Sequence, residues 1–140
     1  MPNKNPVKVN MPSEDTEFLI PAEYANTKIY LTLMVDIKED GWVYAAGHSI
    51  YLDTLNLYPQ KSPEPVDLKL KYAHELKDLR LAIVSHVSCF FENGETDKTP
   101  TINYTLILEA GDVLLDKFQA KSTDRDVSRF RSLIIFKLQQ

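Results

Sequence analysis

The sequence predicts an all-β fold, namely an antiparallel β-sandwich of about seven or eight strands. Three observations indicate this class. Short segments with alternating apolar and polar residues recur along the chain, which is the pattern of strands with one face in a core. Turn-forming residues separate these segments, and no long stretch shows a convincing helical period. The alternatives are a small β-barrel, or an α+β fold if the last segment is helical.

We expect residues 1–27 to form an extended N-terminal arm and residues 28–140 to form a single sandwich domain. The arm is rich in proline and polar residues and has no sustained apolar period. Its apolar patch, from Phe18 to Ile20, interrupts this composition. We expect the patch to dock on the domain or on a neighbouring subunit.

Two strands are expected at the start of the domain. Residues 28–37 place their aliphatic side chains on one parity, which predicts a strand. A short charged turn ending at Gly41 follows, so a hairpin is expected between this strand and the next. The second strand, residues 42–52, is apolar on both parities, which indicates contacts on both faces and a bend or bulge near Gly47.

The middle of the chain predicts a loop, a strand, a brief helical turn and a long strand. Residues 58–65 contain three prolines and therefore predict a loop. Residues 66–72 alternate between apolar and charged side chains and predict a strand with one face in water. A helical turn is expected within 73–78, and residues 79–91 predict the long strand.

A second hairpin is expected in the last third of the chain. Residues 92–100 have the composition of an exposed turn. The segments 102–108 and 113–120 flank a turn at Gly111, so they are expected to pair with each other.

The C-terminal segment, residues 122–138, is open to two interpretations. Phe130, Ile134 and Leu138 fall at a helical spacing, and Ser122 or Thr123 suits a helix cap. The near alternation of apolar and polar residues favours a strand, which is the interpretation we prefer.

The composition is that of an ordinary globular domain. Of the 140 residues, 44% are hydrophobic and 26% are charged. The net charge is −4 and the basic residues are scattered, so no nucleic-acid partner is expected. The longest strongly apolar stretch, Leu133 to Phe136, is too short for a membrane span.

The cysteine content and the first residues bear on the location of the chain. Cys89 is the single cysteine, which excludes an internal disulfide and a cysteine-based zinc site. It lies in an apolar run, so we expect a small buried hydrophobe. No apolar segment typical of a secretory signal follows the first residues. A cytoplasmic location is favoured, although a mature secreted form would look the same.

The residues show no catalytic constellation, so an enzyme is not expected. Ser85–His86 and His48–Ser49 are neighbours, but adjacent residues of a strand point to opposite faces. These two histidines and His74 lie on separate predicted segments without the spacing of metal ligands. We interpret each as a surface or core histidine.

No cofactor is expected, but a calcium site is an alternative. Calcium prefers carboxylate oxygens, and three predicted loops carry pairs of aspartates that can converge at one end of a sandwich. The pairs are Asp36 with Asp40, Asp112 with Asp116, and Asp124 with Asp126. Solvated turn residues explain them equally well.

An aromatic cluster is the remaining candidate for binding, and it consists of Trp42, Tyr44, Tyr51 and Tyr58. If Trp42 and Tyr44 face outward, they can stack on a sugar ring or anchor a protein partner. If their strand is central in a sheet, the rings belong to the core.

The function that we expect is that of a non-catalytic interaction module. It would bind a protein partner, or a second copy of itself, through a sheet face or through the arm that contains Phe18 and Ile20. A carbohydrate-binding, lectin-like sandwich that uses the aromatic cluster is the alternative.

Overall fold

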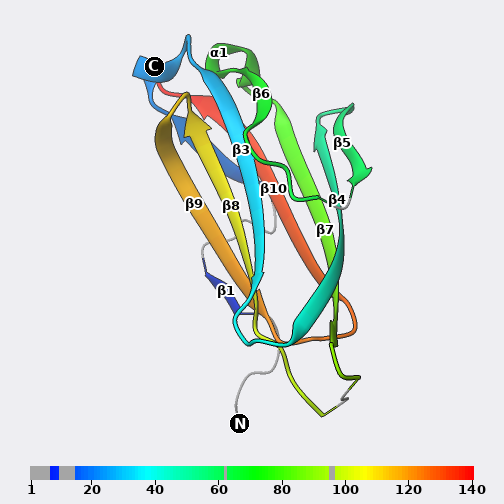
Figure 1. Cartoon of the computed structure of the whole chain (residues 1–140). Helices are drawn as coiled ribbons and strands as arrows, with labels where there is room; N and C mark the ends of the chain where they lie inside the picture. Colours follow the sequence, from blue (N-terminus) through cyan, green and yellow to red (C-terminus); the bar gives the residue numbers. More distant parts are fainter. Residues whose placement is uncertain (1–6, 10–14, 62, 95–96) are drawn as a thin grey trace.

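The computed structural model describes residues 7–9, 15–61, 63–94 and 97–140 and confirms the predicted β-sandwich (Figure 1). Two five-stranded sheets face each other across one core. The first sheet has the order β1 (Val7–Val9), β9 (Val113–Ser122), β8 (Ile102–Ala110), β3 (Lys28–Ile37) and β6 (Leu68–Tyr72). The second has the order β2 (Thr16–Ile20), β10 (Ser128–Leu138), β7 (Arg80–Phe91), β4 (Trp42–Leu52) and β5 (Leu55–Lys61).

Besides the strands, the described residues form two short helices, η1 (Ala22–Tyr24) and α1 (Ala73–Leu76). The second confirms the helical turn expected within 73–78. No helix in the described ranges has the length and apolarity needed to cross a membrane.

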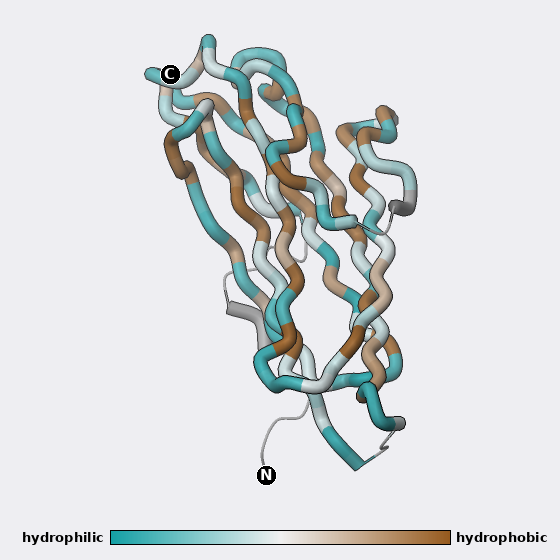
Figure 2. The backbone as a smooth tube through the Cα atoms, viewed as in Figure 1, coloured by the Kyte–Doolittle hydropathy of each residue, from teal (hydrophilic) through white to brown (hydrophobic). Residues whose placement is uncertain are grey.

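The core follows directly from the alternation of side chains along the strands (Figure 2). Inward-facing residues of the two sheets meet between them, and each strand turns its other face away from the core. The fully buried side chains include Ile20, Ile29, Leu31, Leu33, Ile50, Leu81, Ile83, Leu106 and Phe136. The C-terminal segment is the strand β10, so the helical alternative is wrong.

The described residues form ten strands, more than the seven or eight expected. Two of the additional strands, β1 and β2, lie in the segment that was expected to be an arm. The third, β5, lies partly in the segment 58–65 that was expected to be a loop. It accommodates Pro59 because it is the edge strand of its sheet, where one side of the backbone needs no ladder partner.

The hairpin predicted at Gly41 is wrong, whereas the hairpin at Gly111 is confirmed. Strands β8 and β9 pair with each other around Gly111, which has a φ of +61°. Strands β3 and β4, on either side of Gly41, belong to different sheets. The connection between them is held by the Glu39 carboxylate, which accepts hydrogen bonds from the backbone N–H and the hydroxyl of Thr101. An alternating pattern fixes which face of a strand is buried, but it does not fix the partner strand.

The strand predicted over 66–72 is shorter than expected. Asp67 has a φ of +52°, which interrupts the alternation, and the strand β6 starts only at Leu68. As a result Val66 is 71% exposed instead of facing the core, and Leu70 is the buried residue of this strand.

Strand β2 ties the apolar patch Phe18 to Ile20 to its own domain. It pairs in parallel with β10, and the side chain of Ile20 is completely buried. The ring of Phe18 contacts Phe118 and Phe136 edge-on, with centroid distances of 6.2 Å in both cases. Residues 1–6 and 10–14 of the expected arm lie outside the described residues.

We therefore expect Ile20→Ala to destabilise the domain by about 2 to 5 kcal/mol, because it leaves a cavity in the core. Leu19→Ala is the matched control, since Leu19 is 56% exposed on the other face of the same strand. Its effect should be about 0.5 kcal/mol or less. Urea denaturation measures both, and equally small effects would contradict the packing of β2 on β10.

Candidate functional site

Three polar side chains meet inside the sandwich, and they come from both sheets. His48 of β4 lies opposite Ser85 of β7 in the antiparallel pairing of these strands. Both residues share the inward parity of their strands with apolar neighbours such as Ile50 and Ile83. Tyr104 reaches them from β8 in the first sheet. The register between β4 and β7 therefore places His48 beside Ser85, and the packing of the first sheet on the second brings Tyr104 to them.

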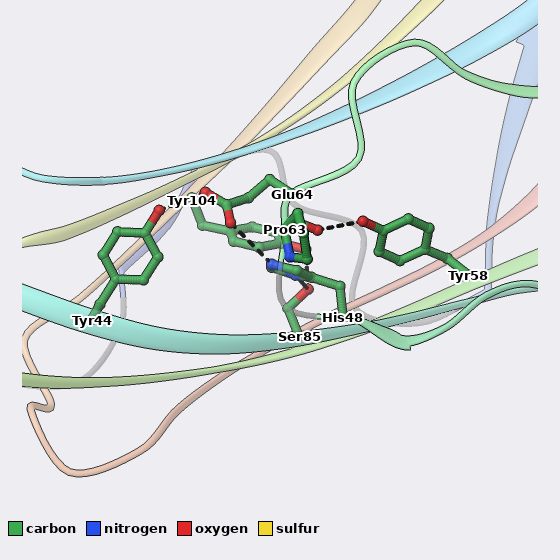
Figure 3. Close-up of polar contacts among 7 residues, drawn as sticks. All are labelled: Tyr44, His48, Tyr58, Pro63, Glu64, Ser85 and Tyr104. Atoms are coloured by element: carbon green, nitrogen blue, oxygen red, sulfur yellow. Dashed lines mark hydrogen bonds and ion pairs between the residues drawn. The ribbon is translucent and has the colours of Figure 1, made fainter.

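These three side chains form a continuous chain of hydrogen bonds (Figure 3). The Nδ1 atom of His48 lies 2.7 Å from the Ser85 Oγ, which lies 2.6 Å from the Tyr104 hydroxyl oxygen. His48 and Ser85 are fully buried and Tyr104 is 1% exposed. Stacking of the Tyr104 ring on Phe130, with centroids 4.4 Å apart, fixes the ring in place.

Glu64 closes this network from the connection between β5 and β6 (Figure 3). Its Oε2 atom lies 3.5 Å from the Nε2 of His48, and its Oε1 accepts a hydrogen bond of 2.6 Å from the Tyr44 hydroxyl. The neighbouring backbone is also held, because the Tyr58 hydroxyl donates to the Pro63 carbonyl oxygen. These contacts hold the Glu64 carboxylate beside His48, at the end of the buried hydrogen-bond chain that lies nearest the surface.

The same connection is anchored to the edge of the first sheet. The Leu33 N–H donates to the Pro65 carbonyl oxygen at 2.9 Å, and the Asp67 N–H donates to the Thr32 hydroxyl at 3.0 Å. We call residues 63–67 the Glu64 segment. It bridges the two sheets on one side of the sandwich.

Burial sets the charge state of the network. It lowers the pKa of His48 below the ordinary value, and the nearby Glu64 carboxylate only partly opposes this effect. Burial, together with the hydrogen bond to Glu64, raises the pKa of Tyr44 to about 12. Burial also raises the pKa of Tyr104. At neutral pH the imidazole and both phenols are therefore uncharged.

A consistent assignment of protons follows from the chemistry of the partners. Because the Glu64 carboxylate can only accept, a neutral His48 with its proton on Nε2 places a donor toward it. Nδ1 then accepts from Ser85, and Ser85 accepts from Tyr104. Within the described residues the Nε2 atom has no hydrogen-bond partner, and the Oε2 atom of Glu64 lies 3.5 Å from it.

This arrangement holds the fold together but does not expose a nucleophile. The Ser85 Oγ is buried and contacts His48 and Tyr104, so a substrate cannot approach it in this conformation. What faces outward is the Glu64 carboxylate, whose side chain is 21% exposed.

The aromatic residues predicted as a binding cluster do not form one exposed platform. Trp42 and Tyr44 lie on the inward parity of β4 and are half-buried, with Trp42 edge-on against Phe91. Tyr51 is 41% exposed on the opposite face of β4. Tyr58 is half-buried on β5. Trp42 and Tyr44 line the same hollow, and Tyr44 and Tyr58 both hydrogen-bond to the connection that carries Glu64.

Phe18 and Ile20, the apolar candidates for partner contact, lie on β2. That strand is the opposite edge of the second sheet from β5. The structure therefore does not bring them to the aromatic residues of β4.

Sequence reasoning missed the pairing of His48 with Ser85, because only sequence neighbours of each residue were considered. A signal was present, since each is the polar member of an otherwise apolar inward series. Pairing these two strands would have placed the two residues side by side. Nothing in the sequence marks Glu64, because its position depends on how the Glu64 segment crosses between the sheets.

The three aspartate pairs considered for calcium do not all lie at one end of the sandwich. Asp112 follows the end of β8 that lies beside the start of β3, whereas Asp36 lies near the other end of β3, opposite Asn103. The described ranges contain no group of three or more histidine, cysteine, aspartate or glutamate side chains arranged to hold a metal ion. Cys89 is 6% exposed, and burial raises the pKa of its thiol to about 11.

Strand β6 is shorter than its neighbour β3, so it covers only part of the edge of β3 (Figure 1). Strand β6 pairs with β3 from Lys28 to Leu31, and the Glu64 segment adds one further hydrogen bond, at Leu33. Backbone groups of a strand alternate in direction, so Val35 and Ile37 direct their N–H groups to the same side as Leu33. No described residue pairs with them there. We call this stretch of β3, residues 34–37, the open edge.

A hollow of about 270 Å³ lies between the open edge and the start of β4. Its apolar lining consists of Val35, Ile37, Trp42 and Tyr44, and its acidic lining of Asp36, Glu39 and Asp40. On the β4 side, pairing with β5 begins only at His48, so β4 too lacks a described partner strand beside this hollow. The hollow therefore combines half-buried apolar side chains with backbone groups of β3 and β4 that have no described partner strand.

Fold and site together define a two-sheet β-sandwich with a buried polar network beside an open strand edge. No protein-family model, curated protein or solved structure matches the chain.

The lowered pKa of His48 predicts how the stability of the domain depends on pH. The unfolded chain takes up a proton on this histidine at a higher pH than the folded chain does, so its contribution is fully present above about pH 6.5. As the pH falls below that value, the free energy of unfolding should decrease by at most about 1.4 kcal/mol per pH unit. Urea denaturation between pH 7.5 and 5.5 (about two units) measures this slope.

His48→Gln should flatten the slope, because the titrating group is removed while a hydrogen-bonding side chain remains. His74→Gln, which removes an exposed imidazole from α1, is the matched control. An unchanged slope in His48→Gln would contradict the assignment of this pH dependence to the buried histidine.

Proposed function

We propose that this chain is a non-catalytic interaction module that binds an extended segment of a protein partner by strand addition at the open edge. The observation that carries the proposal is the backbone at Val35 and Ile37, which no described residue pairs on the side away from β8, beside a hollow lined by half-buried apolar side chains. Binding would extend the first sheet beyond β3, in line with the short strand β6.

Unpaired strand edges readily pair with another chain, and proteins usually block them with proline, a bulge or inward charges. The open edge contains none of these, since its sequence is Met-Val-Asp-Ile and its pairing with β8 is regular. At about 3.3 Å per residue it spans about 13 Å, which is enough for a short added strand. Main-chain hydrogen bonds would supply affinity in this mode of recognition.

Side-chain contacts would supply selectivity. Alternate residues of an added strand point to the same side, so one set would enter the hollow in front of Trp42 and Tyr44. Half-buried aromatic residues contribute strongly at protein interfaces when a partner covers them. We infer that the inward residues of the bound segment are apolar.

The other expected modes find less support. The patch Phe18 to Ile20 is part of a strand in its own sheet, so it would have to leave the core to reach a neighbour. The carbohydrate alternative requires an exposed aromatic platform, and the inward orientation of Trp42 and Tyr44 does not favour it.

The proposal is tested by selecting peptides of about ten residues from a random linear display library on the immobilised chain. Binding of a selected peptide should slow the hydrogen exchange of the Val35 and Ile37 amides in NMR spectra. Val35→Pro should weaken binding about tenfold or more, because it removes a backbone donor that no described residue of the fold accepts from.

Val35→Ala is the matched control, since it shortens the same side chain but keeps the amide. Denaturation curves establish that both variants are folded. If no peptide is selected, or if the selected peptides bind Val35→Pro as well as the unchanged chain, strand addition at this edge is ruled out. The exchange measurement on the unchanged chain decides the question if Val35→Pro does not fold.

A further inference from the structure

The charges around the open edge restrict the chemistry of the segment that it would bind, and this step rests on the proposed function. Carboxylates border both ends of the edge, with Glu64 beside Leu33 and with Asp36, Glu39 and Asp40 beside Ile37. Among these, Glu39 is engaged by Thr101. Two described basic residues lie near the Ile37 end of the edge: Lys38 directly follows it in the sequence, and Arg125 lies over the Trp42 ring at 5.1 Å.

Glu64 differs from the other carboxylates because it is partly buried and has no cationic partner among the side chains that the structure describes. Its neighbours within hydrogen-bond or ion-pair distance are the Tyr44 hydroxyl and the imidazole of His48. Both are uncharged at neutral pH, as derived above. A carboxylate that is partly withdrawn from water gains more from a cation than an exposed one does.

The imidazole of His48 provides a second, independent observation at this point. Its side chain is completely buried, and its Nε2 atom is aimed at Glu64 but has no hydrogen-bond partner among the described residues. Buried polar atoms are rarely left in this state without a reason. Here the unpaired atom marks the place where the polar network ends and Glu64 faces the outside.

Glu64 also lines the larger open hollow beside the edge, which measures about 1010 Å³ and includes Val35 and Tyr104 in its lining. The lysines that line the same hollow, Lys117 and Lys121, are on β9. That strand is separated from β3 by β8, which places its backbone about 10 Å away. They are therefore poorly placed to neutralise Glu64.

We propose that the segment bound at the open edge carries a lysine or arginine that pairs with Glu64. The apolar residues of the segment would fill the hollow at Trp42, and the basic residue would lie at the end of the edge where Leu33 is already paired. The partner is thus an extended segment that combines alternating apolar residues with a basic residue at one fixed position.

Parallel selections from the same peptide library test this proposal with the unchanged chain, Glu64→Gln and Glu23→Gln. The glutamine at position 64 can still accept the Tyr44 hydrogen bond, so only the charge is removed. Glu23 is exposed on η1, away from the edge, and is the matched control. Peptides selected on the unchanged chain and on Glu23→Gln should carry a basic residue at a fixed position, and those selected on Glu64→Gln should not.

The pairing itself is tested by replacing the basic residue of a selected peptide with norleucine. This change should lower the affinity for the unchanged chain about tenfold and leave the affinity for Glu64→Gln nearly unchanged. Selected peptides without a preferred basic residue, or a preference that persists in Glu64→Gln, would overturn the assignment while strand addition stands. Failure to select any peptide would instead remove the proposed function, and this inference with it.

Discussion

The buried hydrogen-bond chain of His48, Ser85 and Tyr104 is the constraint on which the arrangement of this sandwich depends. An unsatisfied buried polar group costs about 1 to 3 kcal/mol, so these side chains tolerate burial only in mutual contact. Contact requires that β4 and β7 pair with His48 opposite Ser85, and that β8 of the other sheet packs at the same level. A shift of one residue in the register would turn one of the partners to the outer face. The network therefore specifies the register within a sheet and the alignment between sheets, which apolar packing alone specifies less sharply.

The position of the Glu64 segment follows from the same network. His48 ends the chain of hydrogen bonds with its Nε2 atom, and the segment brings a carboxylate to that atom. To reach it, the chain leaves β5 of one sheet and crosses to the edge of the other, where Pro65 pairs with Leu33. The crossing occupies the edge position beside the middle of β3. The last part of the strand, from Val35 to Ile37, pairs with β8 on one side and is left without a described partner strand on the other. An internal requirement for a polar partner thus has an external consequence, namely the open edge.

The sequence predicts those features of the fold that depend on local pattern and misses those that depend on pairing. The parity of β3 and β8 identifies their buried faces, and Gly111 identifies a true hairpin. The turn at Gly41 has the same local signals, yet its strands lie in different sheets.

The candidate site shows the same limit. His48 and Ser85 can each be recognised as a polar residue within an apolar inward series, but their proximity is a property of the strand order. Glu64 lies in a proline-rich connection whose composition indicates only a loop. Its contact with His48 is set by the path of the chain between two sheets, which no local pattern encodes. The orientation of the aromatic residues was not predicted for a related reason, because parity alone could not show which face of β4 is inward.

Glu64 is held too well to be displaced by a partner, and this restricts how binding can occur. Removing it would leave the Tyr44 hydroxyl and the Nε2 atom of His48 without their neighbour, and both would lose favourable interactions in a poorly solvated place. A bound segment that replaced Glu64 would have to supply an acceptor of equal quality at the same point. A segment that adds a cation on the outer side of Glu64 keeps every existing contact and completes the charge balance. The polar network and the open edge are therefore compatible with binding in which the partner extends the existing structure and rearranges none of it.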